Sequence, residues 1–283
     1  MKNLKYLFCV AFVLMLSAAA FAQAPAAIKR TTTKSDRIPF GVGGTLAVVG
    51  APQGSIRVEG WSQNEIEVTA QIEISAANEA DLAKLSQVTG FAVEETLGRT
   101  GIISIGPNDK KALKKIDKKF PKHLIGAPFK IDYVIKVPRY TDLQIDGGVG
   151  DLYVAGVEGA FRINVLDGNS TIDLVGGGLL GTFGKGVVNI TIPSRSWRGR
   201  FAEVNLAAGD LNVNLPAGLN AEFDANILRT GKIENLFSSF TPRDRKGEFT
   251  ERSIVAKTGA GSIPLKFTVG DGNMTINEIN KPG

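Results

Sequence analysis

Four aspartates beside glycine-rich segments are the residues whose types and spacing could do chemistry in this chain: Asp151, Asp167, Asp173 and Asp210. Two carboxylates close together on a β-rich surface could cleave a glycosidic bond, one acting as the acid and the other as the base. Aspartate in a turn has a commoner role, because its side chain accepts hydrogen bonds from the local backbone. The sequence alone leaves both interpretations open.

Histidine and cysteine are too scarce for other catalytic or metal chemistry. The chain has one histidine, His123, next to Lys122, and one cysteine, Cys9. The lysines around His123 supply no carboxylate to orient its ring, so we expect no general base there. One histidine and one cysteine cannot form a zinc site, and no dinucleotide-binding or phosphate-binding glycine motif is complete. We therefore expect no catalytic, cofactor-binding or metal-binding residues and no enzyme activity.

A lysine-rich segment at 108–122 is the compositional outlier of the chain. Its pattern predicts an amphipathic helix with Leu113, Ile116 and Phe120 on one stripe. The stripe could cover an open sheet edge and leave the lysines in solvent. The lysines could instead contact an anionic surface such as phospholipid or an acidic envelope polymer. The residues for that contact are Lys110, Lys111, Lys114, Lys115, Lys118, Lys119 and Lys122.

The first 22 residues predict a cleaved secretory signal. Lys2 and Lys5 precede an apolar run at 6–16, and Ala20-Phe21-Ala22 fits the small-x-small cleavage pattern. No other segment approaches the roughly 20 apolar residues of a membrane-spanning helix. We expect an exported mature chain without a transmembrane segment, located in the periplasm, at the cell surface or outside the cell.

Repeats between residues 147 and 235 decide the fold prediction. The glycines recur about every 18 to 23 residues, each followed by a strand with alternating apolar residues; they are Gly150, Gly168, Gly186, Gly209 and Gly231. A long fixed period favours stacked coils, because one coil alone cannot bury a core. We predict an all-β fold, a right-handed parallel β-helix or β-solenoid-like stack of short strands with one or two short helical excursions. An antiparallel sandwich has the same alternation and is the alternative.

Composition also predicts the domain boundaries. Residues 23–36 lack apolar periodicity and indicate a flexible leader. The β-solenoid domain is expected at 37–282, with a helical, lysine-rich insertion at 76–126. Residues 237–250 are polar and indicate a surface loop. Trp61 could be a stacking platform for a sugar ring, although a Trp that covers the end of a core is commoner.

Three short motifs carry a family resemblance. They are GSIRVEGW at 54–61, GDLNVNLPAG at 209–218 and TGKI at 230–233. With these motifs the chain resembles the bacterial DUF4097 family of adhesin-like proteins over about residues 42–277. The resemblance implies an exported, non-enzymatic β-solenoid, with no catalytic or binding residues to carry over. The lysine-rich segment departs from the family pattern.

The expected function follows from these observations. We expect a cell-envelope or surface protein of adhesin-like type, whose solenoid faces contact a polymer or a partner protein. Removal of residues 1–22 would take away Lys2 and Lys5 and lower the formal net charge from +5 to +3, which is too small to indicate a nucleic acid partner. Two alternatives stay open: a polysaccharide-active enzyme with a carboxylate site on a solenoid face, and a periplasmic module of envelope-stress signalling.

Overall fold

The computed structural model describes residues 27–109, 113, 120–243, 247 and 249–279. The predicted signal peptide at 1–22 lies outside these residues. Six of the seven singled-out lysines also lie outside them: Lys110, Lys111, Lys114, Lys115, Lys118 and Lys119. The amphipathic helix predicted for this segment therefore stays a prediction.

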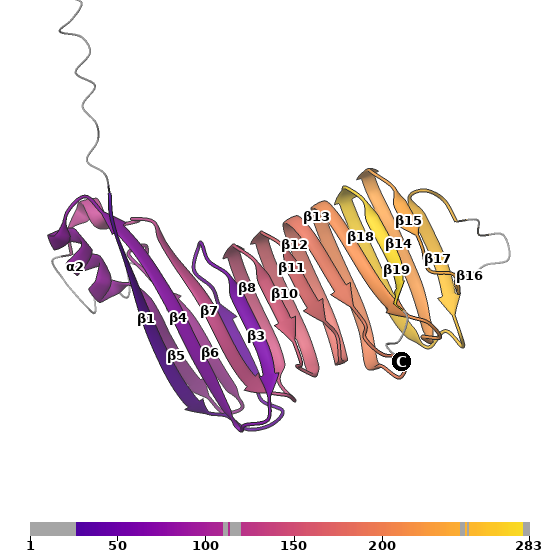
Figure 1. The fold of residues 1–283 in the computed structure, drawn as a ribbon, viewed down its shortest axis with the longest axis horizontal. Helices are drawn as coiled ribbons and strands as arrows, with labels where there is room; N and C mark the ends of the chain where they lie inside the picture. Colours follow the sequence, from indigo (N-terminus) through magenta and orange to yellow (C-terminus); the bar gives the residue numbers. More distant parts are fainter. Residues whose placement is uncertain (1–26, 110–112, 114–119, 244–246, 248, 280–283) are drawn as a thin grey trace, which may run out of the picture.

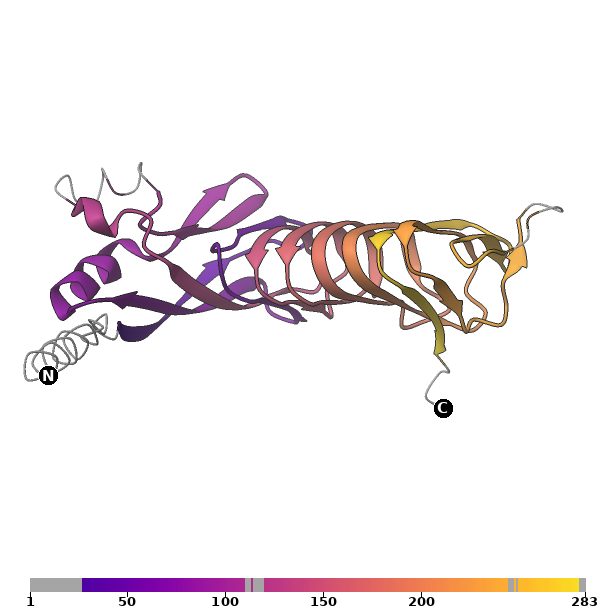
Figure 2. The ribbon, with the colours of Figure 1, turned by 90° about the horizontal axis from the view of Figure 1, so that it is seen from above.

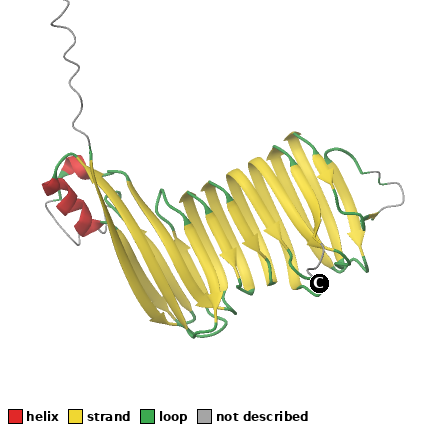
Figure 3. Cartoon of the chain, in the orientation of Figure 1, coloured by secondary structure: helices red, strands yellow, loops and turns green. Residues whose placement is uncertain are grey.

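The described residues form an all-β molecule, which confirms the predicted class. The strands lie side by side along an elongated body, and the helical segments gather at one end (Figure 1; Figure 3). Seen from above, the strands form two layers along the length of the body (Figure 2). We call these layers column A and column B.

Column A follows the hydrogen-bonded order of its strands. From end to end it contains β5 (Gly90–Thr96), β6 (Arg99–Ile105), β2 (Thr45–Val49), β8 (Asp142–Val149), β10 (Gly159–Asp167), the first half of β12 (Gly176–Thr191), the first half of β13 (Arg198–Pro216), β18 (Ile263–Asp271), β14 (Ala221–Thr230), β17 (Ser253–Thr258) and β16 (Thr241–Pro242).

Column B is ordered in the same way. It contains β1 (Ile28–Pro39), β4 (Glu65–Ala76), β7 (Phe129–Pro138), β3 (Ile56–Trp61), β9 (Leu152–Ala155), β11 (Ser170–Asp173), the second halves of β12 and β13, β19 (Met274–Ile279) and β15 (Ile233–Asn235). In the middle of the molecule every pairing in both columns is parallel.

Each central coil runs from column A to column B through a bend. Ser170 pairs with Val188, one coil of 18 residues later, and Val188 pairs with Leu211 after 23 residues. Alternate side chains point inward, so that Ile163 in column A and Ile172 in column B are fully buried. The predicted glycine period is thus confirmed, because it equals the number of residues in one coil. The predicted alternation of apolar residues is also confirmed, because successive side chains of a strand point to opposite faces.

A stack of glycines makes the bend between the two columns. Gly168 has φ +138°, and a Cβ added to it would lie 2.2 Å from the carbonyl oxygen of Gly150 in the coil before. Gly186 relates to Gly168 in the same way at 2.1 Å, and Gly209 to Gly186 at 1.9 Å. Only glycine permits both this conformation and this approach, so the repeating glycines set the distance between coils.

Antiparallel strands and one helix close the N-terminal end of the columns. Helix α2 (Glu79–Val88) begins at Asn78, whose side chain accepts a hydrogen bond from the backbone N–H of Asp81 at 2.9 Å. Its apolar residues recur at helical spacing and are buried: Leu82, Leu85 and Val88. The short helix η2 (Lys122–Leu124) follows the lysine-rich segment. Two residues of the predicted apolar stripe contribute to this end, since Leu113 is buried and Phe120 packs against the core.

The flexible leader predicted at 23–36 is wrong from Ile28 onward. Residues 28–39 form β1, which pairs with all of β4 in antiparallel register. Apolar alternation is missing because β1 is an edge strand with nearly every residue exposed. Backbone pairing holds it, together with ion pairs such as Lys29 with Glu73 at 2.9 Å.

The C-terminal end is closed by part of the segment predicted as a surface loop at 237–250. Phe237 and Phe240 are buried, with ring centroids 4.6 Å apart, and Phe240 packs 4.7 Å from Phe223 of β14. The prediction was wrong for these two aromatic residues. Their apolar surface covers the last coil, although the residues around them are polar.

β18 and β19 are the last two strands in the sequence, but they do not lie at the end of the columns. β18 and β19 pair with β13 on one side and with β14 and β15 on the other. After β13 the chain forms β14 and β15 one coil further along the body. It then returns, so that β18 lies between β13 and β14 and β19 lies between β13 and β15 (Figure 1).

Candidate interaction surface

The outward side chains of column B form two rows of small polar residues across neighbouring strands. Each row follows the parallel register, and each of its members alternates with a buried residue. We call this surface the polar ladder; its residues, all half-buried, are Thr171, Asp173, Asn189, Thr191, Asn212, Asn214, Thr275 and Asn277.

Hydrogen bonds between coils hold the amides of the polar ladder. Asn212 donates from Nδ2 to Oδ1 of Asn189 at 2.9 Å. Asn214 donates to Oγ1 of Thr191 at 3.2 Å and accepts from Nδ2 of Asn277 at 3.0 Å. An amide has two N–H donors and one carbonyl acceptor, so each retains capacity for an external ligand. The result is a fixed array of donors and acceptors repeating at about 4.8 Å along the columns.

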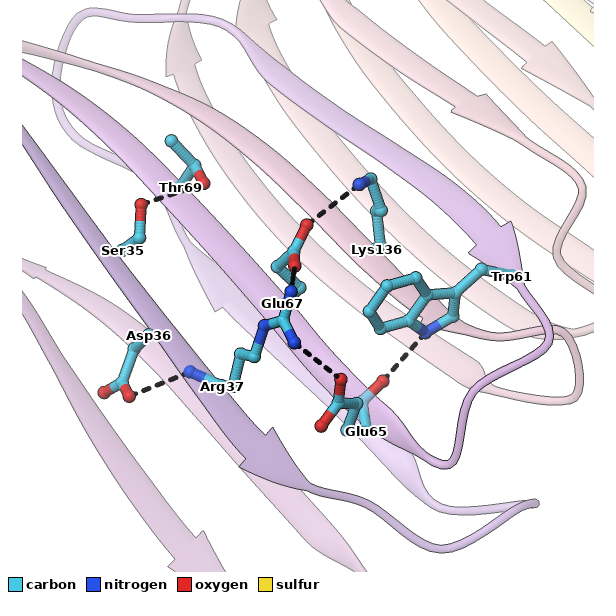
Figure 4. Close-up of polar contacts among 8 residues, drawn as sticks. All are labelled: Ser35, Asp36, Arg37, Trp61, Glu65, Glu67, Thr69 and Lys136. Carbon is cyan, nitrogen blue, oxygen red and sulfur yellow. Dashed lines mark hydrogen bonds and ion pairs between the residues drawn. The ribbon is translucent and has the colours of Figure 1, made fainter.

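The N-terminal end of the same face is charged (Figure 4). Arg37 of β1 reaches Glu67 of β4 at 2.6 Å and Glu65 at 3.6 Å, and Lys136 of β7 donates to Glu67 at 2.8 Å. The hydrogen bonds from Lys136 and then Arg37 hold the pKa of the Glu67 carboxyl below its usual value. Glu67 is therefore a fixed anion and is poorly suited to donate a proton in catalysis.

Two of the four aspartates singled out in the sequence satisfy the backbone of the next coil. Oδ1 of Asp151 accepts from the backbone N–H of Asn169 at 2.9 Å, and Oδ1 of Asn169 accepts from Val187 at 3.0 Å. Oδ1 of Asp210 accepts from the backbone N–H of Asn273 at 3.1 Å. The turn role is therefore the observed one at Asp151 and Asp210.

The other two aspartates, Asp167 and Asp173, lie at the ends of strands. Asp167 ends β10, and Asp173 ends β11 within the polar ladder. Burial raises the pKa of the Asp173 carboxyl above its usual value. Asp173 pairs in register with Thr191 and follows Thr171 on its own strand. Within the described ranges, no hydrogen bond or ion pair joins any two of the four aspartates.

The sequence led us to expect no carboxylate beside the His123 ring, and the structure differs in this respect. Its Nε2 lies 3.1 Å from Oδ1 of Asp81, so it does have a carboxylate neighbour, supplied by the start of α2. The imidazole is 63% exposed. Lys122, the one described member of the lysine set, begins η2 just before it. Over the described part of the chain, no cluster of three or more His, Cys, Asp or Glu residues could hold a metal ion.

Alternation with apolar neighbours in the sequence is enough to place four ladder residues on the outward face, but no motif marks them as a site; they are Asn189, Thr191, Asn212 and Asn214. The available signal was the repeated triplet of a polar residue, an apolar residue and a polar residue, as in NIT at 189–191 and NVN at 212–214. Its importance depends on register, because the triplets form rows only when successive coils align.

Comparisons with known proteins show the fold and leave the family open. No family model and no curated protein matches the chain. A solved structure of a candidate cell adhesion protein from Clostridium sporogenes is similar over 89% of this chain and 100% of that chain, with 12% identity and a TM-score of 0.51. A candidate adhesin from Bacteroides fragilis (15% identity, 88% and 97% coverage) has a TM-score of 0.27. A candidate lipid-binding protein from Parabacteroides distasonis (12% identity, 88% and 97% coverage) has a TM-score of 0.28.

The similarity to the Clostridium sporogenes protein supports a shared all-β architecture, and at this identity it shows the fold alone. The other two TM-scores are too low to support an argument. In the part of the chain that the structure describes, no helix has the length and apolarity to cross a membrane. The chain thus has the fold of a bacterial protein named for adhesion.

Proposed function

We propose that the protein is an exported, non-enzymatic interaction protein of the bacterial cell envelope or surface, of adhesin-like type. In this proposal residues 1–22 direct export, and the coils form a right-handed β-solenoid of the DUF4097 kind, with the insertion at 76–126 covering one end. The polar ladder binds a polymer rich in hydroxyl groups, such as a polysaccharide. The observation that carries the proposal is the set of inter-coil hydrogen bonds along the ladder.

Rigidity and repetition suit the polar ladder to a polymer. A single hydrogen bond contributes only about 0.5–1.5 kcal/mol net. A ladder of equally spaced donors and acceptors forms many such bonds with a repeating chain, and each bond after the first forms at high effective concentration. The ladder side chains are already held by their neighbours, so little side-chain entropy is lost on binding.

A polysaccharide-cleaving enzyme is less well supported. Such an enzyme needs two carboxylates, one of them protonated, on either side of the scissile bond. Burial raises the pKa of the Asp173 carboxyl above its usual value, which is the direction that a proton donor needs. Its neighbours in register and along its strand are threonines, however, while Asp151 and Asp210 are engaged with backbone N–H groups. If Asp173→Asn abolished cleavage of a polysaccharide that the wild type degrades, the enzyme would be the better proposal.

A pair of matched variants tests the ladder. Asn189→Ala with Asn212→Ala removes two amides from the ladder, while Asn164→Ala with Asn205→Ala removes two amides from the outer face of column A. We expect the first variant to sediment with insoluble cellulose, chitin or peptidoglycan at least about tenfold more weakly than the wild type, given two lost hydrogen bonds. We expect the control to bind as the wild type does. Equal losses in the two variants, or no wild-type binding to any of these polymers, would refute the ladder as the site.

Location is tested separately. A tag at the C-terminus that is digested by protease in intact cells supports a surface role. Protection until the cells are permeabilised supports a periplasmic role, including the envelope-stress alternative.

The lysine-rich segment is a second contact in the proposal, directed at anionic surfaces. Its test is co-sedimentation with phosphatidylglycerol vesicles at low salt. Replacement of Lys114, Lys115, Lys118 and Lys119 by Ala should weaken binding, because each lysine near such a surface contributes about 1 kcal/mol. Unchanged binding would remove the segment from the proposal.

A further inference from the structure

We infer that a hollow beside Trp61 binds a carboxylated sugar unit, such as a uronic acid, with the indole ring stacking on the sugar and Arg139 binding its carboxylate. This inference rests on the proposed function, since it assigns the chemical class of polymer that lies on the polar ladder. The hollow has a volume of about 510 Å³, and its lining residues are Gly60, Trp61, Ser62, Arg139, Gly156 and Val175. This volume lies in the range typical of ligand sites.

Four adjacent strands of column B build the hollow. Trp61 is the last residue of β3, and Arg139 follows β7 directly. Gly156 follows β9, and Val175 lies two residues beyond β11. Since β7, β3, β9 and β11 are neighbours in that order, their ends meet at one place on the molecule.

Trp61 is held as a fixed platform. Its Nε1 donates to the backbone carbonyl of Glu65 at 2.9 Å (Figure 4). Its own carbonyl accepts from the backbone N–H of Arg139 at 3.1 Å, which ties the platform to the cation. Lys136 lies on the ring with Nζ 5.4 Å from the centroid. The side chain is half-buried, so part of the ring stays available to the apolar C–H face of a sugar, and a fixed ring loses little entropy on stacking.

The floor of the hollow lacks side chains. A Cβ added to Gly60 would lie 1.9 Å from the carbonyl oxygen of Gly156, so the two backbones approach more closely than any other residue at position 60 would allow. Trp61 and Val175 also line the hollow. Both residues offer apolar surface that the C–H faces of a sugar ring could contact.

Arg139 supplies the charge preference. It is the one charged residue among those that line the hollow, and its side chain is 59% exposed. The nearest carboxylate, that of Glu158, lies 4.0 Å from it, which is beyond hydrogen-bonding distance. A guanidinium has five N–H donors and binds a carboxylate through two of them. Arg139 therefore has donors to offer to a uronate.

The hollow and the polar ladder are connected through β11. β11 carries Thr171 and Asp173 of the ladder and leads directly to Val175 at the wall of the hollow. A polysaccharide lying across the ladder would reach Trp61 at the ends of these strands. The ladder supplies hydrogen bonds to hydroxyl groups, and the hollow selects one acidic unit.

The test is titration of the mature chain with hexagalacturonate and, for comparison, with the neutral cellohexaose. We expect hexagalacturonate to bind at least about tenfold more tightly, and Arg139→Gln to remove that preference, since a charge-assisted pair is lost. Trp61→Ala should weaken binding of both sugars. Trp61 and the buried Trp197 are the two tryptophans, so the fluorescence change on binding should vanish in Trp61→Phe.

Failure of this inference is distinguishable from failure of the proposed function. Equal affinity for the two hexasaccharides, or full binding by Arg139→Gln, overturns the inference. If the ladder variant Asn189→Ala with Asn212→Ala then still loses polymer binding, the proposed function stands without it. Loss of hexagalacturonate binding in Arg139→Gln but not in the ladder variant supports the hollow and refutes the ladder. If Trp61→Ala fails to fold, the result for Arg139→Gln alone tests the inference. We expect Arg139→Gln to fold, because the side chain of Arg139 is exposed.

Discussion

Substitution of one stacked glycine should destabilise the protein by more than the cost of the unfavourable backbone conformation alone. In Gly168→Ala, two effects add. The residue at φ +138° must adopt a backbone conformation that costs an L-residue about 1–3 kcal/mol. Its Cβ would also lie 2.2 Å from the carbonyl oxygen of Gly150, so the neighbouring coil must move, at a further cost of about 1–3 kcal/mol.

The net magnitude follows from these two costs and one gain. Alanine restricts the unfolded chain and returns about 0.4–1 kcal/mol. We therefore expect a loss of about 3 kcal/mol in the free energy of unfolding. For a domain of this size the loss corresponds to a fall of about 6–12 °C in the melting temperature.

Gly218→Ala is the matched control. Gly218 has φ +74°, and no heavy atom lies within 4 Å of its added Cβ. The control bears the conformational cost without the contact, so we expect a loss of about 1 kcal/mol. Urea unfolding followed by circular dichroism, with melting curves on the same samples, measures both variants. Equal losses in Gly168→Ala and Gly218→Ala would refute the argument that glycine stacking sets the distance between coils.

Three further predictions concern ionisable groups. Glu67→Gln should lower the melting temperature at pH 7. The folded-state pKa of Glu67 lies below its usual value of 4.5, so the stability it contributes is present above that value and is lost as the pH falls through the folded pKa. A deficit that persists undiminished at pH 3 would contradict this. Burial raises the pKa of Tyr133 to about 12, so the wild type should lose stability between about pH 10 and 12 more steeply than Tyr133→Phe does in alkaline melting curves. Burial also raises the pKa of Asp173, so Asp173→Asn should melt at a higher temperature than the wild type at pH 7, and at the same temperature near pH 3; a lower melting temperature at pH 7 would show that the carboxylate is stabilised in the fold.

The repeating part of the fold could be predicted from the sequence because its information is local. Strict alternation at 65–74 and 130–137 matches β4 and β7, and the glycine period matches the coil. The helical stripe of Leu82, Leu85 and Val88 likewise matches α2. In each case a few neighbouring residues determine which face is buried.

The ends of the fold could not be predicted, because they depend on partners distant in sequence. β1 has no apolar pattern, since it is held by the backbone of β4. Phe237 and Phe240 lie in a polar segment, and their burial depends on Phe223 of another strand. The position of β18 and β19 between β13 and β14 follows from pairing choices that no periodicity expresses.

The candidate sites could be predicted from the sequence only in part. Alternation places Asn189 and Asn212 on the outside, but their contact requires a register of 23 residues. The hollow at Trp61 needs the ends of four strands to meet, and only Trp61 among its lining residues is conspicuous in the sequence.

The placement of β18 and β19 has a consequence for export. A chain that crosses a membrane N-terminus first delivers β13, β14 and β15 before residues 263–279. Of the strands in that last segment, β18 lies between β13 and β14, and β19 lies between β13 and β15. Until those residues emerge, β13 and β14 each keep an unpaired edge, and the native order of coils cannot be completed. If the chain is exported as proposed, this half can complete its fold only after those residues have crossed the membrane. A protease cut before residue 263 would leave a defect inside the body, with two exposed edges able to recruit strands from other chains.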